Sequence, residues 1–320
     1  MALSDMQVFQ EFAYSAATET LRQKIELFNA ASGGTLILSQ KGNIGDYSQE
    51  ASYAAIANLM RRRDAYGSGS LNATTLEQLN HVAVKVAGGT APVLFEPQQM
   101  TYIQRNPEEA GVVIGEQLAK GMMADHLNTT ILGLRAAMSG VADVNYDGTA
   151  ATLSLGGLVT GASKFGDRAT DLGAWIMHSK SMHDLYASNV ANGNDLFEFG
   201  TVRISQDGFG RRLIMTDSPS LVEVDGGGAG VNHYYTIGLA SAGARVEDNG
   251  DLFTNVETTN GNENIQRTFQ AEYTYNLGLK GYSWNTSVVS PSDAAIGTPA
   301  NWTQIATDVK DTAGVLITSL

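Results

Sequence analysis

The stretch that decides the fold is NPEEAGVVIGEQLAKGMMADHLNTTILGLRAAMSG, residues 106–140. Asn106 and Pro107 are typical of a helix start, because asparagine is a good N-cap and proline suits the first helical position. Glu109 completes the spacing of a capping box, and Gly140 is placed to end the helix in the left-handed conformation. Between these ends, apolar residues recur at spacings of three and four in two runs: Ile114, Leu118 and Met122, then Leu127, Ile131, Leu134 and Met138.

This pattern predicts one nearly continuous α-helix over residues 107–138, lying across a β-sheet through its apolar face. At 1.5 Å per residue, such a helix is a rod about 50 Å long. Its four glycines predict close packing or a bend, because each costs about 1 kcal/mol relative to alanine; they are Gly111, Gly115, Gly121 and Gly133. A helix of this length is typical of a flat, plate-like subunit.

Composition limits the function classes. The chain has 320 residues, with 20 Lys and Arg against 33 Asp and Glu, so its formal net charge is −13. An acidic protein of this kind is a poor candidate for a large phosphate-binding face. The chain has no cysteine, which excludes disulfides, thiolate catalysis and Cys-based zinc sites. Residues 1–5 lack the features of a secretory signal, and no apolar run is long enough to predict a membrane span.

The N-terminal part predicts a helix followed by a projecting arm. Residues 4–30 carry an apolar helical face that includes Phe9 and Phe12, and two interpretations stay open. The helix is either part of its own subunit's core or an arm that packs on a neighbour, in which case Phe9 and Phe12 are inter-subunit contacts. Strands are expected at 35–38 and 81–86, with polar, glycine-punctuated sequence and a short helical patch at about 50–63 between them. A connection this long is uncommon and usually functional, and it suggests a hairpin arm.

Later segments predict a mixed α/β region. A helix is expected over residues 167–189, a short strand over 213–215, and further strands from 234 onward. The tail, residues 301–320, is expected to form a short helix. No internal repeat at solenoid or propeller spacing is present.

Candidate chemistry is sparse. Asp143-x-Asn145-x-Asp147-Gly148 matches the first half of a calcium loop, but the twelfth position is Ser154 and not the bidentate glutamate, which favours a solvated turn. His178 and His183 are five residues apart and do not share a helix face, so structural roles are favoured. No phosphate loop or Gly-x-Ser-x-Gly elbow is present. The sequence therefore predicts no catalytic, cofactor-binding or metal-binding residue.

Arg61, Arg62 and Arg63 form the strongest basic cluster. Three interpretations stay open. The favoured one pairs these arginines with carboxylates of a neighbouring subunit, where bidentate geometry strengthens the contact. The others are a solvated face and a nucleic-acid contact, which would call for more basic residues and interleaved aromatics.

Several stretches, in this order, resemble the major capsid proteins of tailed phages. Residues 106–116 followed by Met122-Met123 resemble the start of the spine helix in one group of these proteins. Residues 175–179, Trp-Ile-Met-His-Ser, resemble the "Met-His" stretch of their axial domain. Residues 210–219 and 277–284 resemble a glycine-strand-Thr-Asp-Ser-Pro segment and a late strand of the same family. The resemblance covers residues 1–285.

The resemblance implies an α+β chain with the Hong Kong 97-type capsid fold. It implies an N-terminal helical arm (1–32), an extended loop (33–81), a peripheral domain with the spine helix (82–140), an axial domain (141–239) and returning peripheral strands (240–285). Residues 286–320 are a C-terminal extension with no family counterpart. It further implies a non-enzymatic subunit of an icosahedral phage head, located in the virion and assembled in the host cytoplasm.

The partners that the resemblance implies are mostly copies of the chain itself, arranged as pentamers and hexamers. A scaffolding protein encoded separately, a portal and a decoration protein are further expected partners, with double-stranded DNA enclosed without specific binding and with no membrane. Alternatives from other classes are a surface-layer or adhesin protein, an encapsulin-type compartment shell, and a hydrolase with an unrecognised carboxylate pair.

Overall fold

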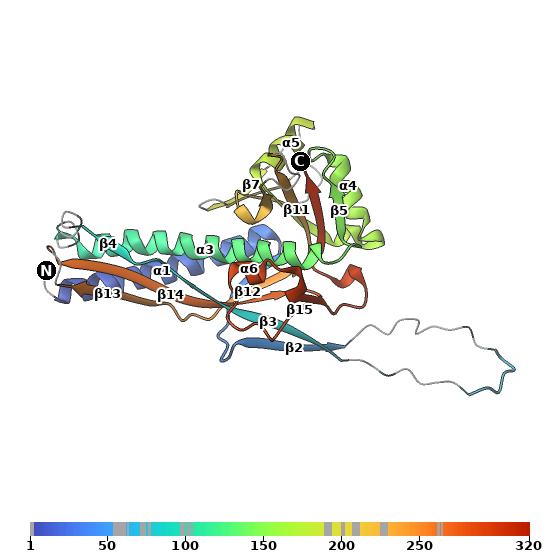
Figure 1. Cartoon of the computed structure of the whole chain (residues 1–320), viewed down its shortest axis with the longest axis horizontal. Coiled ribbons are helices and arrows are strands. Elements are labelled where there is room, and N and C mark those ends of the chain that lie inside the picture. Colours follow the sequence, from blue (N-terminus) through green and yellow to red (C-terminus); the bar gives the residue numbers. More distant parts are fainter. Residues whose placement is uncertain are drawn as a thin grey trace.

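The computed structural model describes residues 3–53, 62, 64–70, 75, 78–96, 99, 101, 103, 105–188, 194–199, 202–206, 212–224, 230–260, 263 and 265–320. They form two lobes (Figure 1). The elongated lobe holds helices α1 (Leu3–Ser32) and α3 (Pro107–Ser139) on one β-sheet. The compact lobe holds a second sheet with helices α4 (Leu155–Ser163) and α5 (Ser179–Ser188), and stands over the C-terminal half of α3.

Helix α3 is the predicted long helix and runs without interruption for 33 residues, which confirms the sequence-based prediction. It lies alongside α1 (Figure 1), and the two backbones approach each other closely at two of its glycines. A Cβ atom on Gly111 would lie 2.7 Å from the carbonyl oxygen of Phe9, and one on Gly115 would lie 2.5 Å from that of Ala13. Gly121, in contrast, has no neighbouring atom within 4 Å. Close packing therefore explains two of the four helical glycines but not Gly121.

Both predicted caps of α3 differ in detail from the structure. The Asn106 side chain makes no capping bond to the backbone; its Nδ2 donates to Glu109 Oε2 at 3.3 Å instead. Gly140 has φ −72° and is right-handed, not left-handed, because its N–H continues the helical bonding to Ala136 O. The turn that follows is closed by Val141, whose N–H donates to Met138 O at 3.1 Å.

The first sheet has the strand order β1-β12-β14-β3-β2, and β13 and β4 also pair with β14. Strand β14 is its long central member, and α3 lies along it (Figure 1). The hydroxyls of Tyr273 and Tyr275 on β14 donate to Asp125 of α3 at 2.8 and 3.2 Å. The strands are β1 (Leu36–Gln40), β2 (Tyr47–Tyr53), β3 (Gln78–Gly89), β4 (Val93–Phe95), β12 (Ala244–Asp248), β13 (Phe253–Thr259) and β14 (Gln266–Leu279).

The second sheet has the order β5-β17-β11-β6-β9-β8-β7, and β10 pairs with β11. Its central strands are almost fully buried, so they form the core of the compact lobe. The strands are β5 (Asn145–Gly148), β6 (Leu172–Met177), β7 (Asn194–Phe199), β8 (Val202–Gln206), β9 (Arg212–Thr216), β10 (Val222–Glu223), β11 (His233–Ala240) and β17 (Gly314–Ser319). The remaining elements are the pair β15 (Tyr282–Trp284) and β16 (Trp302–Gln304), the short helix α6 (Asp293–Ile296), and the 3₁₀ turns η1 (Gly166–Asp171), η2 (Pro219–Leu221), η3 (Pro299–Asn301) and η4 (Val309–Asp311).

Two arginines connect the lobes. Arg135 of α3 lies 3.3 Å from the Glu223 carboxylate, and its guanidinium stacks 3.9 Å from the centre of the Tyr235 ring. Arg212 of β9 donates to the carbonyl oxygens of Ala30 and Ala31, where α1 ends. A cation at a helix C-terminus is favourable because the last carbonyls lack helical partners. Each lobe therefore supplies one arginine that holds the other.

Of the two interpretations of the N-terminal helix, the structure supports the one within its own subunit. The inward face of α1 packs against α3 and the sheet, with Phe9, Ala13, Ala17, Leu21 and Phe28 each at most 2% exposed. An arm that packs on a neighbour would present this apolar face to solvent in a single chain. The prediction of a separate N-terminal arm at residues 1–32 is therefore wrong for the described part of this helix.

The C-terminal prediction is also wrong. No helix spans residues 301–320; they contain β16, η4 and β17. Strand β17 lies between β5 and β11, and Val315, Leu316 and Ile317 are buried. A strand buried on both faces is apolar throughout and lacks the alternation that marks a half-exposed strand, so periodicity alone cannot separate it from a helix. Residues 286–320 are thus built into the core and are not an appended extension.

Two other segments were assigned incorrectly for similar reasons. Residues 167–189 were expected to form one helix, but η1, strand β6 and helix α5 share them. Strand β6 is buried almost throughout, which hides its period. A helical patch was expected at residues 50–63, but 50–53 belong to β2, and most of the rest lies outside the described residues.

Candidate functional site

The β2–β3 hairpin leaves the first sheet, and its position is the main functional feature of the elongated lobe. Strand β3 pairs with β14 only from Val84 to Gly89, whereas β2 pairs with β3 from Val84 back to Gln78. The outer half of the hairpin therefore has no second neighbour in the sheet and projects beyond the lobe (Figure 1). The sequence predicts the projecting hairpin and one of its strands, since residues 81–86 lie in β3, but it assigns the wrong partner strand. Residues 36–40 pair in parallel with β12, and the partner of β3 is β2.

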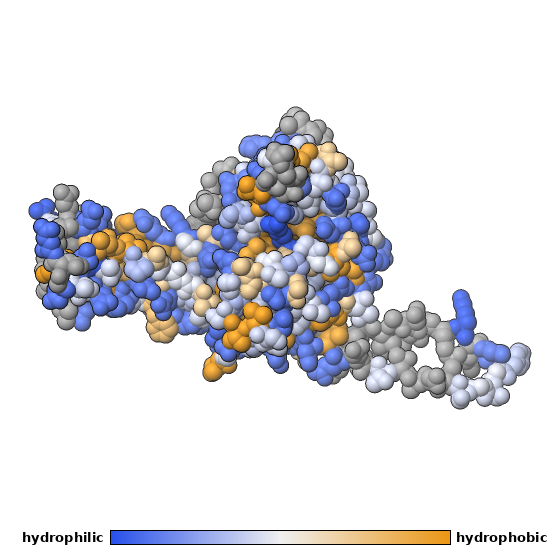
Figure 2. Space-filling model, in the orientation of Figure 1, coloured by the Kyte–Doolittle hydropathy of each residue, from blue (hydrophilic) through white to orange (hydrophobic). Residues whose placement is uncertain are grey.

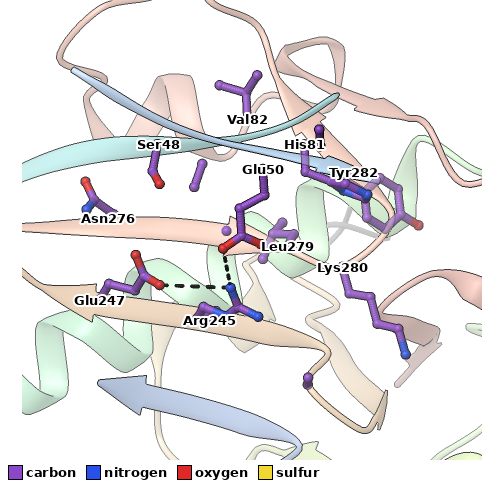
Figure 3. A pocket seen from close by; sticks show the side chains of 14 residues that line it. Ser48, Glu50, His81, Val82, Arg245, Glu247, Asn276, Leu279, Lys280 and Tyr282 are labelled. Atoms are coloured by element: carbon purple, nitrogen blue, oxygen red, sulfur yellow. Dashed lines mark hydrogen bonds and ion pairs between the residues drawn. The ribbon is translucent and has the colours of Figure 1, made fainter. Parts of the chain in front are cut away.

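A hollow of about 320 Å³ opens where the hairpin separates from the sheet (Figure 3). Glu50 and His81 line it from the hairpin, Arg245 lines it from β12, and Lys280 lines it just after the end of β14. The Arg245 guanidinium lies 2.8 Å from Glu50 Oε1 and 4.0 Å from Glu247 Oε1. One arginine thus bridges a carboxylate of the hairpin and a carboxylate of the sheet.

The charges in this hollow are largely paired. Glu247 is also 3.8 Å from Lys41 Nζ. Burial lowers the pKa of the His81 imidazole, and the Glu50 carboxylate acts in the opposite direction. Burial disfavours the protonated ring, so the lowered pKa favours the neutral form of His81.

Uncharged contacts also anchor the hairpin base. The Tyr47 hydroxyl donates to the carbonyl oxygen of Thr286 at 2.9 Å. The backbone N–H of Val82 donates to Ser283 Oγ at 3.3 Å. Both partners lie near β15, so the hairpin base is attached to the segment that follows β14. These contacts fix the base of the projecting hairpin to the elongated lobe.

The described residues contain no cluster suited to catalysis by a metal. No group of three or more His, Asp or Glu side chains in the described parts of the chain could hold a metal ion. In the Asp143–Gly148 segment, Asp147 Oδ1 accepts from the N–H and the hydroxyl of Thr149, as in a local turn. The favoured interpretation of that segment as an Asx-rich turn is consistent with this geometry.

A second candidate surface lies at the opposite end of the elongated lobe, where α3 begins. A shallow groove of about 560 Å³ is lined mainly by apolar side chains of β4 and the first turns of α3. Val93 and Leu94 are 49% and 47% exposed, and Val113 is 48% exposed. Figure 2 shows hydrophobic surface over this part of the lobe. We call this surface the distal groove; its lining residues are Val93, Leu94, Phe95, Gln99, Ile103, Ala110, Val113 and Ile114.

The predicted inter-subunit residues fall in different places. Phe9 is fully buried and packs edge to face on Phe95 and Phe269, so it has no surface for a neighbour, and its prediction is wrong. Phe12, on the same helix, is 38% exposed. Arg62 is exposed, and Arg61 and Arg63 lie outside the described residues.

Sequence reasoning missed the hollow and the distal groove. Glu50 and Arg245 are 195 positions apart in the chain, so no local pattern connects them. For the groove a signal was available: Val112-Val113-Ile114 places apolar residues on more than one face at the start of the helix. An amphipathic helix buries a single apolar stripe against the core. Valines outside that stripe therefore indicate a second contact surface.

A long helix on a sheet, a projecting hairpin and a second lobe joined by paired charges define a structural subunit made for association with other chains. The sequence model of the Gp13-like family, described as "Major capsid protein 13-like", matches residues 5–316. The chain belongs to this family of major capsid proteins. It is a structural subunit of the phage head shell and not an enzyme, and its fold is mixed α+β. The match also reaches beyond residue 285, where the resemblance was expected to end.

Solved capsid structures are similar to the chain over most of its length. The capsid of cyanophage Pam1 is 10% identical, with 88% of each chain covered and a TM-score of 0.49. The capsid of Ralstonia phage GP4 is 9% identical, with 90% of this chain and 87% of that chain covered and a TM-score of 0.49. The capsid of Helicobacter pylori bacteriophage KHP30 is 11% identical, with 89% and 88% covered and a TM-score of 0.48. No curated protein sequence matches the chain. Among the described helices, none combines the length and apolarity needed to cross a membrane.

Proposed function

We propose that copies of this chain form pentamers and hexamers that close into an icosahedral shell around double-stranded DNA. The compact lobes would meet around the fivefold and sixfold positions, and the elongated lobes would join neighbouring capsomers. A portal, a scaffolding protein and a decoration protein are the further partners of this proposal. The observation that carries it is the β2–β3 hairpin, whose outer half has no second strand beside it in its own sheet.

The acidic net charge of the chain supports enclosure of DNA without specific binding. The formal net charge is −13, and phosphate contacts are made by lysine and arginine. An acidic wall repels the packaged polymer and leaves it free to move during packaging and release. In this proposal the DNA is confined because the shell is closed around it, and not because the subunits bind it.

Electron microscopy and sedimentation of the expressed full chain test the assembly. We expect closed, uniform particles, alone or when scaffolding protein is co-expressed. A matched variant replaces residues 54–77 by a short Gly-Ser turn; it should fold, as judged by circular dichroism, yet form no particles. Particle formation by this variant at the wild-type yield would contradict the role proposed for the hairpin.

We also propose that Arg61, Arg62 and Arg63 act between subunits. Changing all three to alanine should leave the isolated chain folded and lower particle yield, and the difference should shrink at high salt because exposed charge pairs are screened. The control removes three other cationic side chains, exposed Arg22, Lys120 and Lys164, with the same change in net charge. Equal yields from the two triple variants would show that net charge alone matters.

A further inference from the structure

We propose that the outer edge of strand β13 pairs with the same edge of a second copy of the chain. The two elongated lobes would then share one continuous β-sheet across a twofold axis. This inference rests on the proposed function and names a surface through which neighbouring capsomers meet. A strand at the edge of a sheet carries unpaired N–H and C=O groups, and it is therefore a template for another strand.

Every second residue of β13 points its backbone groups away from the sheet. In the described part of the chain β13 pairs with β14 alone, and Thr254 lies opposite Ala271. The carbonyl oxygen of Ala271 accepts from the N–H of Thr90 at 2.8 Å, so the backbone groups of Ala271 face the other side of β14. Because antiparallel partners alternate between bonded and non-bonded pairs, Thr254, Val256 and Thr258 point outward.

The outward positions beyond Thr254 are open. The Gln10 side chain of α1 donates to the carbonyl oxygen of Thr254 and covers that position. Among the described residues, no group outside the sheet bonds to the backbone of Val256 or Thr258. Thr258 is also exposed. Two successive outward positions of β13 are therefore available to a further strand.

Strand β1, an outer strand of the same sheet, is closed in a different way. Asn29 of α1 bonds to both backbone groups of Leu38: its Oδ1 accepts from the N–H at 2.9 Å, and its Nδ2 donates to the carbonyl oxygen at 2.6 Å. Strand β13 carries neither the lysine nor the proline by which natural edge strands resist pairing, and its register with β14 runs without a bulge. The sheet is thus protected at β1 and left open at β13.

The position of β13 fits a contact between capsomers. The compact lobe stands over α3, whereas β13 lies along the opposite side of the elongated lobe (Figure 1). In the proposed shell the compact lobes meet around the fivefold and sixfold positions, so the side that carries β13 faces the next capsomer. Two copies that meet through the same surface are related by a twofold axis. A second copy is therefore the strand that completes this edge.

The side chains of β13 favour one register. With Val256 opposite Val256 of the second copy, all three outward positions of each strand are paired. Asn255 then lies opposite Glu257 of the second copy, on the exposed face of the sheet. A register centred on Glu257 would instead place two glutamates directly opposite each other, which is unfavourable.

Proline at an outward position tests the edge without opening the sheet. Thr258→Pro removes an N–H that points away from β14, so the pairing of β13 with β14 keeps its bonds. We expect the unassembled chain to keep its circular dichroism spectrum and unfolding midpoint, while particle yield falls severalfold. Thr258→Val is the matched control, because it also removes the hydroxyl that accepts from Arg267 but keeps the N–H. Equal particle yields from the two variants would overturn the proposal.

Cysteine cross-linking tests the register independently, because the native chain has no cysteine. Particles assembled from a mixture of Asn255→Cys chains and Glu257→Cys chains should form covalent dimers under mild oxidation. Particles made from either variant alone should form few, because equal positions of the two strands are not opposite each other in the Val256-centred register. Asn255→Cys mixed with Val159→Cys is a further control, since Val159 is 56% exposed on the compact lobe.

The outcomes are distinct. Dimers from the 255–257 mixture, and few from the single variants and the 255–159 mixture, support the contact. Intact 255–257 particles without dimers overturn it, and equal dimer yields in mixed and single-variant particles overturn its register. Failure of the wild-type chain to form particles under any condition would instead contradict the proposed function.

Discussion

At the scale of single residues, Gly111 and Gly115 determine how closely α1 and α3 approach. Both glycines face α1, and a Cβ atom at either position would clash with backbone atoms of that helix. The facing residues of α1 are also small, since Ala13, Ala16 and Ala17 are the neighbours of Gly115. Small residues on both helices let the backbones meet, and this contact holds the N-terminal helix in its own subunit.

Gly115→Ala tests this contact. The new Cβ would lie 2.5 Å from Ala13 O, so the helices must separate, and we expect a loss of about 1–3 kcal/mol in the free energy of unfolding. Gly121→Ala in the same helix meets no atom within 4 Å and should instead stabilise the chain by about 1 kcal/mol. Denaturant unfolding of the unassembled chain measures both changes. Equal effects at the two positions would show that packing on α1 does not determine the requirement for glycine.

His126 is a buried titratable side chain on the inward face of α3. Its ring is 1% exposed and packs against Tyr275, with ring centres 4.3 Å apart. Burial lowers the pKa of His126 to about 4, so the folded chain holds the ring neutral. Burial also raises the pKa of the neighbouring Asp125 carboxyl, opposed by the hydrogen bonds from Tyr273 and Tyr275.

The lowered pKa of His126 predicts a loss of stability in acid. In the unfolded chain the imidazole takes a proton near its ordinary pKa of 6.5, whereas in the folded chain it does so only near 4. Between these values the unfolded state binds more protons, so stability falls as the pH falls. From pH 7 to pH 5 this group should cost about 2 kcal/mol.

His126→Phe keeps an aromatic ring at this site and removes the titration. The unfolding free energy of the variant should change less between pH 7 and pH 5 than that of the native chain. Asp125 is present in both proteins, so the difference between them reports on His126. Chemical denaturation of the unassembled chain at the two pH values gives the comparison. Parallel pH profiles for the two proteins would show that His126 does not contribute to acid sensitivity.

At the scale of elements, β17 is the strand whose place is least evident from its position in the chain. It pairs with β11 on one side and β5 on the other, and all six of its residues are buried. Removal of residues 314–320 opens the second sheet between β5 and β11 and exposes both of these strands. We expect an insoluble or unfolded chain, as judged by solubility and circular dichroism.

The control for this truncation removes a segment of the same length, exposed residues 64–70. That shorter chain should be soluble and folded, because the deleted segment buries no core side chain. A soluble, cooperatively folding chain after the C-terminal truncation would contradict the role assigned to β17.

The hairpin is the second element whose behaviour can be predicted. Glu50 and Arg245 are 53% and 42% exposed, so their ion pair contributes little to overall stability, about 0–1 kcal/mol. Its effect should be local: Glu50→Gln should raise amide hydrogen exchange in β2 while the melting temperature stays nearly constant. Lys310→Met breaks another exposed pair, 2.6 Å from Asp167, and should leave exchange in β2 unchanged. Unaltered β2 exchange in Glu50→Gln would contradict the anchoring role of the pair.

At the scale of the whole molecule, a shell subunit gains much of its stability from its neighbours. Obligate interfaces commonly bury about 2,000–5,000 Å², and exposed apolar side chains such as Val93, Leu94 and Phe253 are available for such contacts. Calorimetry should therefore show particles melting at markedly higher temperature than isolated subunits. Equal melting temperatures would mean that assembly adds no stability, contrary to this prediction.

Local features of the chain were predictable from sequence. The start, length and apolar face of α3 were predicted from a proline at the first helical position and from apolar residues spaced three and four apart, which are short-range signals, although Asn106 makes no side-chain cap. The acidic charge and the lack of cysteine likewise follow from composition and limit the chemistry. The order of short motifs indicated the capsid family, which the family model later matched over residues 5–316.

Only the tertiary structure decided which elements meet. Leu38 pairs with Val246, and Tyr234 pairs with Ser319, across long separations that leave no periodic trace. The buried strands β6 and β17 carry continuous apolar runs, so their identity depends on the neighbours that cover both faces. Whether α1 is an arm or part of the core depended on the fit of its alanines to the glycines of α3. Periodicity reports that a surface is buried, but the partner that buries it is chosen by contacts between distant segments.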